Sequence, residues 1–515
     1  LDLVRLQLEQ AGALERAGHY AEGHERAAQA LARALELGYE PAIARARVRV
    51  AALDLALGDA EAARRGLTDA ALLASGIDDH QAAADAASRL AFVLAEELGQ
   101  PDEALRWVRH AEASQGRMPP DPLARARLDG SLGVVHATRG DYAAGLAAFE
   151  RSYAAKRELL GEEHPEVAGA LENVALSHGE VGELAQAHAM QERSLALMEK
   201  AVGPRHPDTA HSLMNLGRSL DELGRHDEAA AAYTRALAIF REALDPRHPM
   251  VARTLSALGQ VAGTQDRLRD AEDYFRQAAE IIEENFGERH REHAWSLADR
   301  AHVAADLGHD DEAAVLYARA HEILEASLGP DHDSLAHVMM GEAATLVELE
   351  RFDEAESLVA RAGEILTERL EPGHPSLAEW HAARAHLLRG QRRLEDARKA
   401  GATAVAVATA ALGPDHPTVA SLLLALGEVE LDLQRYDDAR EHLRRAVTLV
   451  DAAPVGEGFR AAARFALAKA LWPDPVTRAE SLELARRARE GFASHGDVFQ
   501  EDVDETSAWL RDHPR

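Results

Sequence analysis

The sequence predicts an all-α protein built as a linear array of helix pairs. Of its 515 residues, 46% are apolar but only 4% are aromatic, a composition that suits helices packed through small side chains better than sheets. Short linkers with a central histidine are each followed by two apolar patterns of helical period. The linkers recur at a constant spacing of 42 residues, which indicates a repeat array. Their histidines are His164, His206, His248, His290, His332, His374 and His416.

The first helix of a repeat is well defined after the second of these linkers. Leu213, Leu216 and Leu220 form an apolar stripe, with Gly217 as the small residue among them. Gly224 is expected to end the helix because glycine readily adopts the left-handed conformation found at helix ends.

The second helix of the same repeat carries Ala229, Tyr233, Ala236 and Leu237 on one face. A small residue recurs at or near the place of Ala229, every 40 to 42 residues, and lets the two helices of a pair approach closely. Together with Ala229 these positions predict twelve helix pairs. They are Gly23, Ala63, Ala104, Gly145, Ala187, Ala271, Ala313, Ala355, Ala397, Ala439 and Ser481.

The pattern of Ala229, Tyr233 and Ala236, preceded by Gly217 and Gly224, resembles the tetratricopeptide repeat. That repeat usually has about 34 residues, and the longer unit with a Gly-x-x-His-Pro linker resembles the kinesin-light-chain subtype. The resemblance implies a right-handed superhelical solenoid of about twelve helix-turn-helix repeats with a C-terminal capping helix. Departures raise doubt about single turns but not about the fold. Two linkers carry Arg291 or Asp333 in place of proline, and the turn glycine is replaced by Asp266, Glu350, Arg392 and Gln434.

Three regions are expected along the chain. Residues 1–119 hold divergent repeats, 120–450 hold the regular 42-residue repeats with their histidine linkers, and 451–515 hold a degenerate repeat and the capping helix. This last helix, from roughly Val498 to Leu510, is expected to place Val503, Trp509 and Leu510 on the preceding pair. Such a cap is needed because the last apolar face of a solenoid has no neighbour.

The histidine ladder invites a metal hypothesis, but a structural role explains it better. Metal ligation needs nitrogens about 2.0–2.1 Å from one ion, whereas equivalent points on successive repeats lie about 10 Å apart. The proline after most of these histidines suits the first position of a helix, and Glu166 and Asp208 suit its first turn. We therefore expect no metal. The one local cluster, His290, His293 and His302, is expected to consist of solvated helix residues.

Composition and motifs argue against several function classes. The net charge of −31 disfavours nucleic acid and anionic lipid as partners and favours a basic one, bound less tightly at high salt. The absence of cysteine excludes disulfides, cysteine-based zinc sites and iron–sulfur clusters. No phosphate-binding loop, dinucleotide-binding motif, metalloprotease motif or serine-hydrolase motif occurs. These residues are therefore expected to form no enzyme, to need no cofactor and to span no membrane.

The resemblance implies that the first helix of each pair lines a concave groove that holds an extended peptide. Asn173 and Asn215 are similar to the asparagines with which such repeats hold a peptide backbone, because an amide both donates and accepts. One turn further along the helix, Arg218 and Gln260 are expected to project in the same direction, with Arg253 near the start of its helix and Trp295 as an aromatic anchor. The alternative is that these side chains form a solvated face and that Trp295 packs between helices.

The sequence thus predicts an interaction scaffold for a protein or peptide partner, in a bacterial, cytoplasmic signalling context. Its Ala-, Arg- and Glu-rich repeats and its ending SAWLRDHP resemble the repeat regions that follow serine/threonine kinase domains in myxobacteria and related bacteria. Because the chain opens at Leu1, we expect it to belong to a longer product, whose own activity is open. The alternatives are a ligand-sensing solenoid attached to a signalling NTPase or effector enzyme, and a free-standing adaptor.

Overall fold

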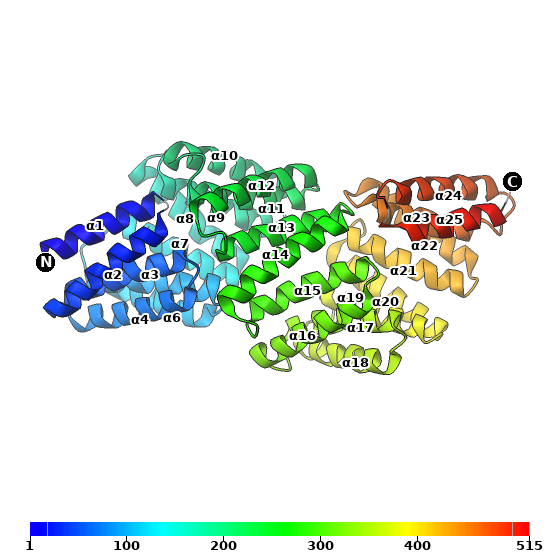
Figure 1. The fold of residues 1–515 in the computed structure, drawn as a ribbon, viewed down its shortest axis with the longest axis horizontal. Helices are drawn as coiled ribbons and strands as arrows, with labels where there is room; N and C mark the ends of the chain where they lie inside the picture. The colour runs from blue at the N-terminus through cyan, green and yellow to red at the C-terminus, as the bar shows by residue number, and fades with distance from the viewer. Residues whose placement is uncertain (18, 181, 497, 514–515) are drawn as a thin grey trace. The chain divides into compact units, whose positions relative to one another are not determined.

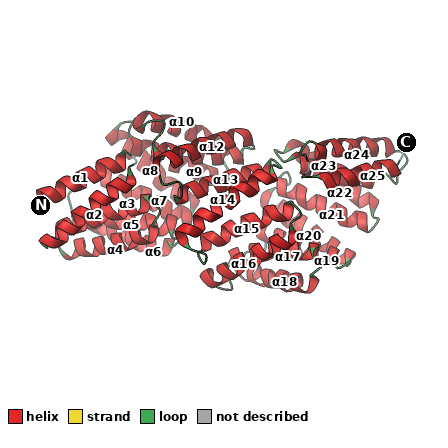
Figure 2. Ribbon diagram, viewed as in Figure 1, coloured by secondary structure: helices red, strands yellow, loops and turns green. Residues whose placement is uncertain are grey.

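The computed structural model describes residues 1–17, 19–180, 182–496 and 498–513. Pro514, the last residue of the SAWLRDHP ending, therefore lies outside the described residues. All regular elements within these ranges are helices (Figure 2). They form two compact units, Leu1–Thr254 and Leu255–Arg515, whose boundary falls inside helix α13 (Pro249–Thr264). Each unit is described by itself.

Unit 1 contains six complete helix pairs, labelled in Figure 1. The first helices of these pairs are α1 (Asp2–Arg16), α3 (Glu40–Ala56), α5 (His80–Phe92), α7 (Pro122–Thr138), α9 (Pro165–Glu180) and α11 (Pro207–Glu222). The second helices are α2 (Tyr20–Leu37), α4 (Ala60–Gly76), α6 (Pro101–Gln115), α8 (Tyr142–Leu160), α10 (Leu184–Val202) and α12 (His226–Ala243). A π-helical segment, Val93–Glu97, continues α5.

Helix α13 begins the seventh pair, and the remaining helices belong to unit 2. The second helices of its pairs are α14 (Leu268–Phe286), α16 (Asp310–Leu328), α18 (Phe352–Arg369), α20 (Leu394–Leu412), α22 (Tyr436–Ala452) and α24 (Arg478–Ala493). The first helices are α15 (Arg291–Asp306), α17 (Asp333–Glu348), α19 (Pro375–Gly390), α21 (Pro417–Asp432) and α23 (Glu457–Leu471), and α25 (Gln500–Asp512) follows the last pair. The twelve predicted pairs and the C-terminal helix are confirmed.

Small residues hold the two helices of each pair together, as the sequence predicts. All twelve positions equivalent to Ala229 are buried, and Ala229 itself is completely inaccessible. A β-carbon added to Gly217 on α11 would lie 2.6 Å from the ring of Tyr233 on α12. Glycine is therefore required there by close packing against the aromatic ring, because a contact of that length forces the neighbour to move.

The turns between the two helices keep one geometry although their sequence varies. Gly224 has a φ of 71°, in the left-handed region. Asp266, Glu350, Arg392 and Gln434 adopt the same region with φ between 57° and 60°. Residues with side chains pay roughly 1–2 kcal/mol for this conformation, so packing of the helix pair, not local preference, fixes these turns.

In unit 1 the chain returns to its own beginning after four to five repeats. The Nε2 atom of His206 lies 2.9 Å from the carbonyl oxygen of Arg16, at the end of α1. The Nε2 atom of His248 lies 2.9 Å from the carbonyl oxygen of Ala56, at the end of α3. Both contacts join residues that are 190 or 192 positions apart, so they close a turn of the solenoid within this unit.

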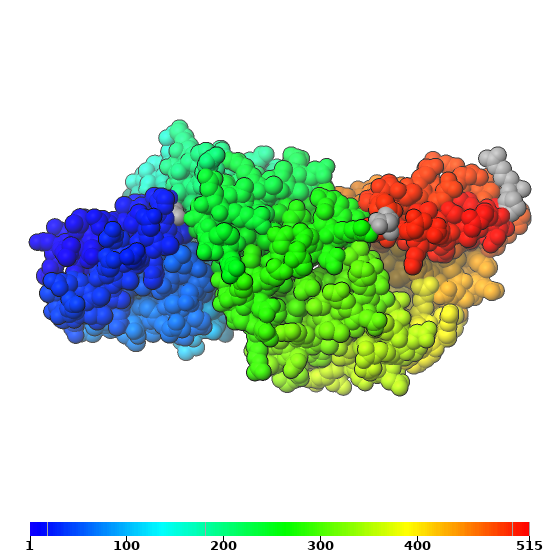
Figure 3. Space-filling model, in the orientation of Figure 1, coloured from blue at the N-terminus to red at the C-terminus, as the bar shows by residue number. Residues whose placement is uncertain are grey.

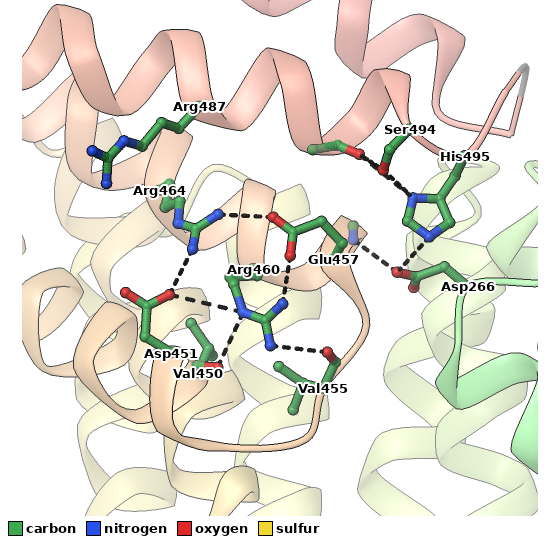
Figure 4. A network of polar contacts seen from close by, with 12 residues as sticks. Asp266, Val450, Asp451, Val455, Glu457, Arg460, Arg464, Arg487, Ser494 and His495 are labelled. Carbon is green, nitrogen blue, oxygen red and sulfur yellow. Dashed lines mark hydrogen bonds and ion pairs between the residues drawn. The ribbon is translucent and has the colours of Figure 1, made fainter. Parts of the chain in front are cut away.

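Unit 2 contains a corresponding contact of different chemistry (Figure 4). The carboxylate of Asp266 accepts a hydrogen bond of 2.7 Å from the backbone N–H of Gly458, 192 positions later. Arg460 and Arg464 both bind Glu457, Arg464 at 2.8 Å, and so fix the start of α23 where this contact is made.

The C-terminal helix covers the last pair of unit 2. Val503, Trp509 and Leu510 pack against the apolar cluster that includes Phe465 and Phe492, which confirms the predicted cap. The helix begins at Gln500, two positions later than expected, and its first turn carries Glu501 and Asp502.

Candidate interaction surface

Every linker histidine caps the helix that follows it. The imidazole Nδ1 atom accepts the backbone N–H two positions later, at N···N distances of 3.0–3.3 Å in all seven linkers. The sequence analysis attributed the helix start to the proline and missed this role, because caps are usually Ser, Thr, Asp or Asn. The predicted structural role of the histidines is thus confirmed, with the imidazole itself as the cap.

His206 and His248 use both ring nitrogens. A backbone carbonyl can only accept, so the Nε2 atom of each ring is the donor to Arg16 or Ala56. The neutral ring then has a free lone pair on Nδ1, which the cap requires. Burial lowers the pKa of His248, which favours the neutral form.

The cluster of His290, His293 and His302 is only partly as expected. His302 is exposed and lies 3.8 Å from Asp306. His293 is 3% exposed, so the expectation that it is solvated is wrong. It faces the protein interior because it follows the linker directly, where the start of the first helix packs on the preceding pair. No group of three or more potential ligands with metal-binding geometry occurs among the described residues.

The two predicted backbone-holding asparagines lie on adjacent first helices, Asn173 on α9 and Asn215 on α11, and both are half-buried. The Nδ2 atom of Asn215 donates to the Oε2 atom of Glu172 at 3.5 Å. Within the described part of the chain, the amide of Asn173 has no side-chain or backbone partner.

A buried carboxylate lies beneath these asparagines and was missed by the sequence analysis. Glu172 is 8% exposed and accepts hydrogen bonds from the hydroxyls of Ser194, at 3.1 Å, and Ser212. Burial raises its pKa, and the hydroxyl donors partly offset this effect. A glutamate beside an apolar stripe is the only signal in the sequence, and it does not reveal burial.

Cationic and aromatic groups surround the asparagines in unit 1. Arg218 and Arg253 are exposed, and the Nε atom of Arg218 lies 3.5 Å from Glu222. His211 is accessible to solvent and its ring lies 5.1 Å from that of Phe240. Close surroundings of protein lower the pKa of His211, with a further contribution from Arg253. We call Asn173, Asn215, His211, Arg218 and Arg253 the asparagine patch.

The other two predicted site residues, Gln260 and Trp295, belong to unit 2. Gln260 is exposed. Trp295 is half-buried and packs against the apolar cluster that includes Leu297 and Leu335, which corresponds to the packing alternative. At the place of the asparagines, α15 carries Asp299, whose pKa is raised to about 6 by burial.

Comparison with known proteins identifies the repeat. The family model described as tetratricopeptide repeat matches residues 124–200, 168–242, 222–284, 251–326, 292–368 and 376–452, which together exceed half of the chain. The chain belongs to the tetratricopeptide repeat family. No protein of curated function matches it. None of its helices, over the residues described, has the length and apolar character needed to cross a bilayer.

Several solved tetratricopeptide-like structures are similar to this chain. Kinesin-light-chain repeats from Podosopora anserina share 20% identity over 41% of this chain and 99% of theirs, with a TM-score of 0.36. BtubC from P. vanneervenii shares 21% identity over 43% of this chain and 89% of its own, with a TM-score of 0.35. A Rap protein complexed with competence and sporulation factor shares 13% identity over 71% and 98%, with a TM-score of 0.49. Because repeat solenoids offer extended binding surfaces, family membership supports a protein–protein interaction scaffold.

Proposed function

We propose that this chain is a non-catalytic interaction scaffold that binds a peptide or protein at the asparagine patch. The observation that carries the proposal is the pair of half-buried amides over the buried Glu172. We further propose that the scaffold is the docking arm of a bacterial signalling protein such as a serine/threonine kinase, acting in the cytoplasm.

The chemistry of the patch suits a peptide main chain. The hydrogen bond from Asn215 to Glu172 fixes one amide, while its carbonyl oxygen accepts no hydrogen bond within the described residues. The Asn173 amide offers both a donor and an acceptor. A peptide unit satisfies both kinds of group, and a side chain that is already positioned loses less conformational entropy on binding.

The test is a double variant, Asn173→Ala with Asn215→Ala. Partners are captured from lysate of the source cell on wild-type and variant protein, quantified by mass spectrometry, and the most depleted partner is then titrated. We expect affinity to fall by about tenfold or more, because two polar groups of the partner lose their hydrogen bonds. Asn285→Ala, on the second helix α14, is the matched control and is expected to bind normally. Unchanged affinity of the double variant would refute the patch.

The mass of the native gene product tests the docking-arm hypothesis. A mass well above 55.7 kDa supports a larger parent protein, and phosphoryl transfer is then compared with and without the solenoid. A parent that hydrolyses nucleotides without transferring phosphate to protein would favour the sensor alternative. A mass close to 55.7 kDa would leave a free-standing adaptor.

A further inference from the structure

A second candidate site lies at the beginning of unit 1, away from the asparagine patch. A cavity of about 610 Å³ is lined by the first helices α1, α3 and α5, together with Leu1 and Tyr39. Ligand sites typically have about 300–1,000 Å³. The cavity is accessible, since Leu1 is 60% exposed and the side chain of Arg5 is 74% exposed. Figure 3 shows α1 and α2, in dark blue, at the surface.

The charge of this cavity is opposite to that of the chain. Residues 1–90 contain 10 arginines, no lysine and 14 acidic residues. Half of the arginines line the cavity, but only three of the acids do, namely Asp2, Glu9 and Asp85. The lining arginines are Arg5, Arg16, Arg45, Arg49 and Arg89. Guanidinium groups are therefore concentrated on this surface of an acidic segment.

Two of these guanidiniums converge over a glycine. Measured from the position that a β-carbon on Gly12 would take, the Nη2 atom of Arg49 lies at 3.3 Å and the Nη1 atom of Arg16 at 3.5 Å. Arg49 is also paired with Glu15. The guanidinium of Arg16 has no carboxylate partner among the described residues, although the end of its helix is fixed by His206. The absent side chain of Gly12 leaves space beside two donors suited to a carboxylate.

We propose that this cavity binds an acidic peptide segment that also carries apolar side chains. The carboxylate of an Asp or Glu side chain lies above Gly12 between Arg16 and Arg49, and apolar side chains contact Val4, Leu8 and Val48, which also line the cavity. Because the guanidiniums are spread over three helices, the site suits several carboxylates rather than one chain terminus. This site is separate from the asparagine patch and selects the opposite charge to that expected of a partner for the whole chain.

The experiment uses three peptide pools and the full chain. The first pool contains fluorescent nonapeptides, capped at both ends, with Glu, Asp, Leu or Val at every position. In the second pool Gln and Asn replace Glu and Asp. The third has the composition of the second but a free C-terminal carboxylate. Fluorescence anisotropy at low and high salt is expected to show binding of the acidic pool about tenfold tighter than of either other pool, with salt weakening it. Equal binding of the three pools, or no binding of the acidic pool, would overturn the proposal.

Variants locate the binding. Arg16→Gln combined with Arg49→Gln, and separately Gly12→Ala, are each expected to weaken binding of the acidic pool by about tenfold. Gly12→Ala fills the space between the guanidiniums and places a better helix former in α1, so its effect is not explained by unfolding. Arg26→Gln, an exposed arginine on α2 outside the cavity, is the matched control. A loss in Arg26→Gln equal to that in the cavity variants would refute the location.

The same titration separates this site from the proposed function. The Asn173→Ala, Asn215→Ala variant is expected to bind the acidic pool normally. If its binding falls as much as that of the cavity variants, the acidic peptide occupies the asparagine patch and the cavity proposal is wrong.

Discussion

Replacing His248 tests the closing contact of unit 1 directly. The imidazole caps α13 through the N–H of Met250, at 3.0 Å, and donates to the carbonyl of Ala56, at 2.9 Å. His416 caps α21 in the same way, at 3.2 Å, but is exposed. The two histidines therefore differ by one long-range hydrogen bond and by burial.

The magnitudes follow from these contacts. Loss of an N-cap costs about 1 kcal/mol, and loss of a buried hydrogen bond costs about 1 kcal/mol more. His248→Ala is thus expected to destabilise its surroundings by about 2 kcal/mol, and His416→Ala by about 1 kcal/mol. His248→Asn retains a cap acceptor on a shorter side chain, and should therefore lose only the second contribution.

Native-state hydrogen exchange is the appropriate assay, because repeat arrays do not unfold in a single step. His248→Ala should lower the protection of amides at the end of α3 and the start of α13 by about 30-fold, and His416→Ala should lower protection at α21 by about fivefold. Equal losses in the two variants, or full protection at α3 in His248→Ala, would show that the contact with Ala56 does not stabilise the unit.

Three further outcomes are expected. Because burial lowers the pKa of His248, the folded state binds fewer protons than the unfolded state; protection near this residue should be complete above pH about 6.5 and fall as the pH drops below that value, and His248→Asn should abolish this dependence in exchange experiments. The pKa of Asp299 is raised to about 6, so its charge opposes folding at neutral pH; Asp299→Asn should stabilise unit 2 by about 1 kcal/mol at pH 7.5, discounted for its partial exposure, and by nothing at pH 4.5 in urea titrations, whereas destabilisation at pH 7.5 would contradict the assignment. Gly217→Ala should cost about 1–3 kcal/mol through its contact with Tyr233, while Gly169→Ala, with open space around it, should be neutral or stabilising in thermal unfolding.

The sequence predicts the repeat architecture closely because the relevant signals are local. Helical periodicity, small residues such as Ala229 and a constant linker spacing each act within one repeat. The capping role of the histidines was missed although all seven are visible in the sequence, since nothing in the spacing shows which ring nitrogen accepts. The turns at Asp266 and Gln434 were in doubt because local preference disfavours them, and helix packing overrides it.

The candidate sites were predicted only in part. The positions of Asn173 and Asn215 follow from their place in the repeat, but the buried Glu172 beneath Asn215 depends on hydroxyls from α10 and α11. The arginine-lined cavity was not anticipated, because its groups come from three helices that the sequence does not align with the regular repeats.

The sequence by itself determined that the chain is a helical solenoid, where each helix pair lies and which small residues its packing requires, because those features repeat with a fixed period. Only the tertiary structure decided which polar groups are buried and which distant segments meet. The contacts of His206 with Arg16, of His248 with Ala56 and of Asp266 with Gly458 join residues about 190 positions apart. They arise because small rotations between successive repeats accumulate until the chain meets itself, and no local pattern records that sum.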